Sequence, residues 1–312
     1  MAVAWPIVAR AQQTARVLRV GFVGAQPRDA AIYVAFRKRM AELGYREDRY
    51  FIFEYIQTPS IDAYDESFRE LAARKPDIIM AAGNEPALRA ARAAAGALPI
   101  VFLAIDFDPV ERGYVASLVR PGGNITGIFV HPLELAAKRV ELLREALPHA
   151  RHLGLIGDAS SRDQVEAAAV AARSLGFEAR RIEVTGQPPD YAAAFAQMAD
   201  APGEPIAIPA GPMFLRDRAT IGRMLLERRI PSISAFQEIV EAGAVMSYGI
   251  DLVGLFRDVA GVVDQIAKGA NPAELPIVQT SRFHLAVNLR SATALGLTLP
   301  LAFTARADEV IE

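Results

Sequence analysis

The sequence contains no cysteine and only four histidines among its 312 residues. The first absence excludes disulfide bridges, thiolate zinc sites and cysteine nucleophiles. The second argues against a metal site built from histidine. We therefore expect the protein to hold neither a metal nor a cofactor.

The chain also lacks an excess of charge of either sign and long apolar runs. Its formal net charge is −2, so it has no basic footprint of the kind that binds nucleic acid. No apolar run approaches the roughly 20 residues that a membrane-spanning helix needs. We expect no nucleic-acid partner, and we do not expect an integral membrane protein.

Sequence motifs of common enzyme classes are missing too. G-x-S-x-G, H-E-x-x-H and the phosphate-binding loop do not occur, and Gly21 and Gly24 stand outside any G-x-G-x-x-G pattern. One pair of acids, Asp106 and Asp108, could serve as general bases, but no nucleophile or histidine motif accompanies it. An enzyme that uses cleft carboxylates stays open as an alternative, whereas the prediction is a protein without enzymatic activity.

What the sequence does contain is a regular alternation of strand-like and helix-like segments. The length of 312 residues suits two domains better than one, and the hydrophobic content of 52% is typical of a chain that forms a core. The strands are continuous apolar runs, as in parallel sheets covered by helices on both faces. The alternation fills 17–105 and starts again at 133, so the sequence predicts an α/β fold with two doubly wound parallel-sheet lobes.

Three segments resemble a known protein family. Asp108-Pro109-Val110 is followed by SLVRPGGNITG, and two longer segments occupy 246–277 and 283–312. These motifs are similar to those of ABC-transporter substrate-binding proteins, in a group whose characterised relatives bind aromatic amino acids. The resemblance covers nearly all of the chain from Val17 onward. It implies a type I periplasmic-binding-protein fold with a multi-crossing hinge, a small-molecule ligand and an ABC transporter permease as partner.

The resemblance also implies that the chain passes between the lobes three times. We expect lobe 1 to comprise 17–127 and 251–273, and lobe 2 to comprise 128–250 and 274–312. Ala9-Arg10-Ala11 is typical of the end of a secretory signal, so we interpret 1–16 as a signal-peptide remnant, with a disordered leader as the alternative. The protein is then expected to be exported to the periplasm.

Ligands of open parallel sheets bind at the carboxyl ends of strands, and the turns at these ends supply the candidate site of lobe 1. Gln26 follows the first strand. Gly83 and Asn84 follow the third, where Asn84 is either an ordinary helix cap or part of an anion site at the helix N-terminus. Asp106 and Phe107 follow the fourth, where the carboxylate would pair with a ligand ammonium and the ring would stack on the ligand or pack in the core.

Lobe 2 offers candidates at the equivalent turns. Ser160 is either a helix cap or a second place for a ligand carboxylate. Phe214, Phe236 and Gln237 follow two later strands and would face lobe 1 across a cleft, although Phe214 also fits the apolar side of its own helix.

Tyr248 and Asp251 lie at the predicted second crossing. Tyr248 would close over the ligand, and Asp251 either contacts it or caps the next helix. The expected ligand is a small carboxylate with an aromatic or large apolar body, and an amino acid would set its ammonium against Asp106, Asp251 or Glu238. If none of these acids faces the cleft, an aromatic acid without an amine is favoured. The ligand-sensing domain of a regulator, which shares the two-lobed plan, remains a further alternative.

Overall fold

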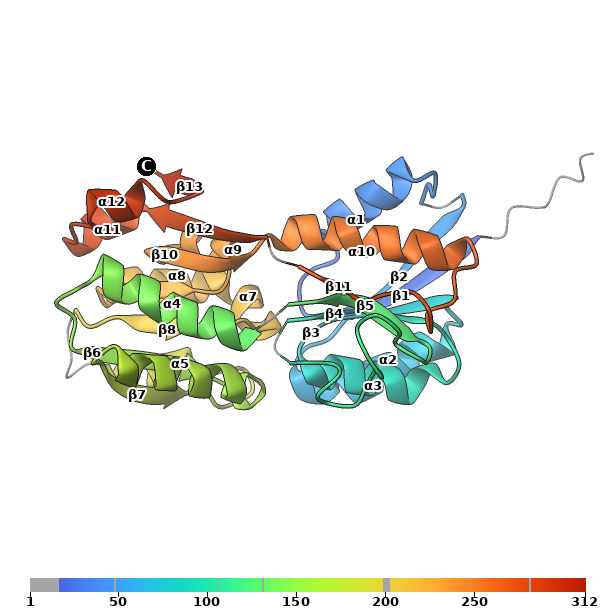
Figure 1. Cartoon of the computed structure of the whole chain (residues 1–312), viewed down its shortest axis with the longest axis horizontal. Helices are drawn as coiled ribbons and strands as arrows, with labels where there is room; N and C mark the ends of the chain where they lie inside the picture. Colours follow the sequence, from blue (N-terminus) through green and yellow to red (C-terminus); the bar gives the residue numbers. More distant parts are fainter. Residues whose placement is uncertain (1–16, 48, 106, 131, 199–202, 281) are drawn as a thin grey trace, which may run out of the picture.

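The computed structural model describes residues 17–47, 49–105, 107–130, 132–198, 203–280 and 282–312. These residues form two α/β lobes that lie side by side along the longest axis of the molecule (Figure 1). Each lobe is built around its own sheet with helices on both faces. The predicted fold class of two doubly wound parallel-sheet lobes is therefore confirmed.

Lobe 1 contains a six-stranded sheet in the order β11-β5-β4-β3-β1-β2, and all of its pairings are parallel. The apolar runs read from the sequence become its central strands, and β4 is buried at every residue. The strands are β1 (Leu18–Gly24), β2 (Phe51–Gln57), β3 (Ile78–Gly83), β4 (Ile100–Ala104), β5 (Ile125–Phe129) and β11 (Val278–Gln279).

Helices cover both faces of this sheet. On one face α2 (Tyr64–Ala73), preceded by the short η1 (Ile61–Ala63), packs against α3 (Glu85–Ala95). On the other face α1 (Ala31–Glu42) packs against α10 (Leu252–Ala267). In Figure 1, α10 stands out because its late, orange colour lies among the blue elements of lobe 1.

Lobe 2 contains a seven-stranded sheet in the order β13-β12-β10-β9-β8-β6-β7. Its pairings are parallel except for β10 with β12. The strands are β6 (His152–Gly157), β7 (Glu178–Glu183), β8 (Ile206–Ile208), β9 (Ser232–Ser234), β10 (Met246–Ile250), β12 (Phe283–Asn288) and β13 (Glu309–Ile311).

The helices of lobe 2 are mostly shorter than those of lobe 1. The pair α4 and α5 packs together, and α6, α8 and α9 contribute to the core on the other face. The helices are α4 (Pro132–Ala146), η2 (Ala159–Ser161), α5 (Arg162–Ser174), α6 (Tyr191–Ala196), α7 (Pro212–Arg216), α8 (Arg218–Glu227), α9 (Gln237–Glu241), α11 (Leu289–Leu295) and α12 (Leu301–Thr304).

The chain passes between the lobes at three places. It leaves lobe 1 between β5 and α4, returns between β10 and α10, and leaves again between β11 and β12. The backbone is tight at the second crossing, because a Cβ on Gly249 would lie 1.9 Å from the Ala235 carbonyl oxygen. Only glycine lets β10 run this close to its neighbour.

One hydrophobic cluster continues from lobe 1 into lobe 2. It joins Ile105 and Phe256 of lobe 1 to Ala210 and Phe236 of lobe 2, so the facing surfaces of the lobes are in contact. Within the described ranges, no helix has the length and apolarity to cross a membrane.

Two sequence-based predictions concern residues that the structure does not describe. The expected export signal at 1–16 and the candidate Asp106 both lie outside the described residues. The expected ranges of the two lobes stay a prediction.

Candidate functional site: a cavity between the lobes

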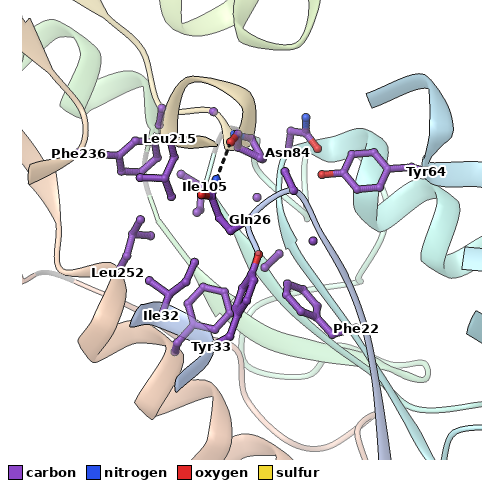
Figure 2. A pocket seen from close by; sticks show the side chains of 18 residues that line it. Phe22, Gln26, Ile32, Tyr33, Tyr64, Asn84, Ile105, Leu215, Phe236 and Leu252 are labelled. Atoms are coloured by element: carbon purple, nitrogen blue, oxygen red, sulfur yellow. Dashed lines mark hydrogen bonds between the residues drawn. The ribbon is translucent and has the colours of Figure 1, made fainter. Parts of the chain in front are cut away.

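A cavity lies where the carboxyl ends of the lobe 1 strands meet lobe 2. Its empty volume is about 500 Å³, part of which is open to solvent. Figure 2 shows side chains from both lobes converging on it. Among the described residues, those that line it carry no charged side chain. The full lining comprises Phe22, Gly24, Ala25, Gln26, Ile32, Tyr33, Tyr64, Ala82, Gly83, Asn84, Ile105, Ala210, Gly211, Pro212, Leu215, Phe236, Leu252 and Phe256.

Asn84 is the most unusual polar group of this lining. It is 1% exposed, and neither its Oδ1 nor its Nδ2 has a hydrogen-bond partner in the described part of the chain. It occupies the N-cap position of α3, yet its side chain makes no capping bond. An amide buried without partners is costly, so the side chain is free to serve a group that enters the cavity.

The backbone around Asn84 adds to this polarity. Helix α3 begins at the next residue, and the positive end of its dipole points at the cavity. Pro86 removes one of the free N–H groups of the first turn, and Ala87 N–H donates to the Asn84 carbonyl at 3.1 Å. Glu85 pairs with Tyr114 at 3.1 Å and Arg112 at 3.6 Å, so its carboxylate is engaged outside the lining.

Gln26 is the second buried polar side chain of the lobe 1 face. Its Nε2 donates to the Pro212 carbonyl of lobe 2 at 3.1 Å, the bond drawn dashed in Figure 2. Its Oε1 accepts a 3.4 Å bond from Arg218, also of lobe 2. Gln26 therefore joins the two lobes at the cavity itself.

Aromatic rings form the floor of the cavity on the lobe 1 side. The Tyr33 ring lies edge-on to Phe22 and Phe256, with centroids 5.1 and 5.5 Å away. Burial, helped by neighbouring Tyr55, raises the pKa of the Tyr33 hydroxyl well above its usual value, so it stays neutral. Gly24 makes room for it, because a Cβ there would lie 2.3 Å from the Tyr33 oxygen.

The part of the cavity lining that belongs to lobe 2 is apolar and packs closely against lobe 1. It consists of the turn Ala210-Gly211-Pro212 together with Leu215 and Phe236. A Cβ on Gly83 would lie 2.7 Å from Pro212 Cγ, and Gly83 has a φ of +110°. The closed arrangement of the lobes therefore depends on a residue without a side chain at position 83.

Polar contacts around the rim also join the lobes. Arg216 Nη1 donates to the Pro59 carbonyl at 2.7 Å, Gln187 donates to Asp62, and Arg112 pairs with Asp163. Each contact connects a lobe 1 residue with a lobe 2 residue. Together with Gln26 they define a closed conformation.

The structure brings four of the sequence-predicted site residues to the cavity: Gln26, Gly83, Asn84 and Phe236. Three predicted aromatic contacts lie elsewhere. Phe107 packs edge-on against Tyr114 at 5.8 Å, Phe214 packs against Tyr191 at 6.3 Å, and Tyr248 packs against Phe283 at 6.1 Å.

The remaining predicted polar contacts also lie away from the lining. Ser160 bonds to Asp158, the residue that caps η2. Gln237 donates to Glu309 at 2.7 Å. Asp251 is exposed and caps α10 through Gly254 N–H at 2.9 Å. Of these three residues only Asp251 has the cap role that was its alternative, because Asp158 and not Ser160 is the cap of η2.

Few of the acidic residues predicted to bind a ligand ammonium are therefore available for that role. Glu238 does not line the cavity, and burial raises the pKa of its carboxyl, which favours the uncharged form. Asp251 is occupied as a cap. Of the three predicted acids, Asp106 alone falls outside the described residues.

Sequence reasoning missed most of the aromatic lining. Phe22 precedes the first strand-to-helix turn by two residues, and Tyr33 and Tyr64 lie in the first turns of α1 and α2. The nearness of Phe22 to a predicted strand end was a usable signal, whereas Tyr33 and Tyr64 lie well beyond the ends of β1 and β2. Phe256 offered no such signal, because it reaches the cavity only through the packing of α10 on α1.

Comparison with known proteins identifies the class. A family model for ABC transporter substrate binding proteins matches residues 22–311, so the chain belongs to this family. Among individual proteins it is similar to the tyrosine-binding protein of Clostridioides difficile (strain R20291), with 25% identity over 228 residues. That match covers 72% of this chain and 64% of the relative, so it spans less than two thirds of the relative's length.

Solved structures agree on the fold. An ABC domain from Streptococcus pneumoniae in complex with L-Trp superposes with a TM-score of 0.83 at 24% identity, covering 95% of this chain and 100% of that one. The ligand-free, open structure of a substrate binding protein with adhesive properties from Clostridium difficile gives 0.65 at 22% identity, covering 95% and 99%. The type I periplasmic-binding fold is therefore confirmed.

Proposed function

We propose that this protein is the exported substrate-binding protein of an ABC importer, and that it encloses a small carboxylate with an aromatic or large apolar body between its lobes. The observation that carries the proposal is the buried Asn84 amide, which has no partner among the described residues and faces an apolar, aromatic cavity. A ligand that supplies the missing hydrogen bonds removes the penalty of that burial.

We assign the ligand carboxylate to the part of the cavity beside Asn84, at the N-terminus of α3. There it accepts a hydrogen bond from Asn84 Nδ2 and lies at the positive end of the α3 dipole. Oδ1 of the same amide remains available for a donor on the ligand, such as an ammonium or hydroxyl. The helix has eleven residues, long enough for its dipole to contribute.

The apolar body is assigned to the Phe22, Tyr33 and Phe256 floor. Aromatic pairs favour edge-to-face or offset geometry, and these three rings line the cavity. The complex of one structural neighbour with L-Trp and the name of the tyrosine-binding relative support an aromatic ligand for this chain.

Opening and closing follow from the hinge. In the proposed cycle, ligand enters between open lobes, and closure forms the Gln26 and rim contacts that the structure contains. The closed form is then presented to the permease in the periplasm. The small-molecule enzyme that the sequence left open has no lining acid among the described residues to support it.

A thermal-shift and calorimetry screen tests this function. The screen pairs each aromatic amino acid with its analogue lacking the amine, such as phenylalanine with 3-phenylpropionate. At a ligand concentration 100 times the dissociation constant, linkage predicts a gain of about 2.7 kcal/mol in unfolding free energy. If the amine-free acid binds more tightly than the amino acid, Asp106 does not bind a ligand ammonium. Shifts with sugars or polyamines alone would contradict the proposed ligand class.

Asn84→Asp tests the carboxylate corner. The substitution keeps the size of the side chain but sets a negative charge beside the ligand carboxylate. We expect binding to weaken at least tenfold, about 1.4 kcal/mol, measured by calorimetry with the best ligand of the screen. Asn271→Asp makes the same charge change at an exposed turn and should leave binding unchanged. Equal affinities in a well-folded Asn84→Asp protein would move the carboxylate site elsewhere.

A further inference from the structure

Arg139 on α4 is a buried cation that the proposed ligand site does not use. Its side chain is 3% exposed, and no carboxylate among the described residues forms an ion pair with it. Burial alone lowers the pKa of its guanidinium, to about 10. A buried charge without a counter-ion is costly, so its contacts indicate what it contributes.

Those contacts link two separate parts of the fold. Arg139 Nη1 donates to the Tyr248 carbonyl of β10 at 3.2 Å, and Nη2 donates to Gln164 Oε1 of α5 at 3.4 Å. The Gln164 side-chain amide in turn bonds both backbone polar groups of Ala210. Its Nε2 donates to the Ala210 carbonyl at 2.8 Å, and its Oε1 accepts from Ala210 N–H at 3.0 Å.

Both ends of this chain of bonds lie near the boundary between the lobes. Ala210 belongs to the lobe 2 turn that lines the cavity, and Pro212 of the same turn accepts the bond from Gln26 across the cleft. Tyr248 lies two residues before the end of β10, where the chain crosses to lobe 1. Arg139 itself is on the helix that follows the first crossing, α4, which starts beside the hinge (Figure 1).

The third crossing of the chain between the lobes also lies next to β10. It leads into β12, which pairs with β10 so that Tyr248 faces Leu285. A planar guanidinium donates in two directions at once, and here it spans the hinge strand and the glutamine that holds the cavity turn. A lysine ammonium lacks this fixed fork.

We propose that Arg139 and Gln164 form a positioning relay, which ties the Ala210–Pro212 turn to the hinge strand and so favours the closed arrangement of the lobes. Arg139 acts through Gln164 and Tyr248, not by contact with the ligand. The relay rests on the proposed function only in requiring lobes that open and close.

Two substitutions break the relay in different ways. Gln164→Glu still accepts from Arg139 and Ala210 N–H, and it supplies the missing counter-ion, but it cannot donate to the Ala210 carbonyl. Arg139→Lys keeps the charge but not the two-directional bridge. A purely structural role predicts that Gln164→Glu alters only the melting temperature and leaves the lobes as they were.

The readout is the distance between the lobes without ligand. The chain has no cysteine, so nitroxides attach cleanly to Glu66→Cys on α2 and Ala192→Cys on α6, both exposed. Pulsed electron-spin resonance then gives the populations of closed and open forms. Arg144→Met is the matched control, because Arg144 lies on the same helix but bonds to the Pro148 and Ala150 carbonyls.

We expect both relay variants to lose at least about twofold in the ratio of closed to open forms. Arg144→Met should match the parent. Unchanged distances in both relay variants, or a parent that is already fully open, would overturn the inference. Failure of every ligand to bind would refute the proposed function but would leave this measurement intact.

Discussion

The lobe 1 side of the cavity carries the polar side chains of Gln26 and Asn84 and the aromatic floor of Phe22, Tyr33 and Phe256. On the lobe 2 side the lining is a short turn with Leu215 and Phe236, all without polar side-chain atoms. Hydrogen bonds are directional and apolar contact is not. We infer that lobe 1 selects the ligand and that lobe 2 encloses it.

The elements that support the two faces differ as well. The aromatic groups of lobe 1 extend from β1 and from the long helices α1 and α10, whereas α7 and α9 behind the lobe 2 face have only five residues each. A selecting surface gains from rigid support. A closing surface needs chiefly to fit against its partner.

The largest expected effect comes from preventing the two faces from meeting. Gly83→Ala sets a Cβ 2.7 Å from Pro212, so we expect at least about tenfold weaker binding, or about 1.4 kcal/mol, by calorimetry. Gly44→Ala is the control: its φ of +101° is similarly strained, but nothing lies within 4 Å of the added Cβ. Both variants should lose about 1–3 kcal/mol of stability from backbone strain. Equal binding in the two would show that closure does not require this contact.

A smaller effect on affinity is expected from replacing one aromatic residue on each face of the cavity. Phe22 and Phe236 are equally buried, at 1% and 2% exposure, so Phe22→Leu and Phe236→Leu should lower the melting temperature alike. An aromatic pair contributes about 0.5–1.5 kcal/mol beyond its buried area. We therefore expect Phe22→Leu to weaken binding of an aromatic ligand about two- to tenfold, and Phe236→Leu to weaken it less. The opposite ranking would assign selection to lobe 2.

The smallest effect is expected at the rim. Arg112→Gln removes the pair with Asp163 across the cleft, and exposed pairs contribute about 0.2–1 kcal/mol. Affinity should fall by at most about fivefold at low salt, and the difference should vanish as added salt screens the charges. Arg223→Gln breaks a pair within α8 and should not alter affinity at any salt concentration. A salt-independent loss in Arg112→Gln would point to packing as its cause.

The sequence predicted the fold well because its signals are local. Continuous apolar strands, glycine-ended helices and the PGGNITG resemblance identify the two-lobed α/β plan without reference to distant contacts. Local patterns also predicted Gln26, Gly83 and Asn84 as site residues, because these residues lie at or just after the ends of strands. At Asn84 these patterns also suggested a side-chain cap, but the structure has that amide unbonded at the cavity.

The rest of the site depends on which side chain turns inward, and this is a tertiary property. Phe214 and Phe236 follow strands in the same way, yet Phe214 points into the lobe 2 core and Phe236 into the cavity. Tyr248 and Asp251 are near the crossing in sequence, but the β10–β12 pairing and the α10 cap determine their contacts. No spacing rule distinguishes these outcomes.

Helix α10 has a consequence for how the protein is made. It supplies Leu252 and Phe256 to the cavity, and it covers the α1 face of the first lobe although it is synthesised after β10 of the second. A ribosome that has released only the first 250 residues has therefore produced a lobe 1 whose apolar face is still uncovered. Ligand cannot assist folding at that stage, because the floor of its site is not yet complete. Until α10 docks, this uncovered apolar surface is prone to aggregation.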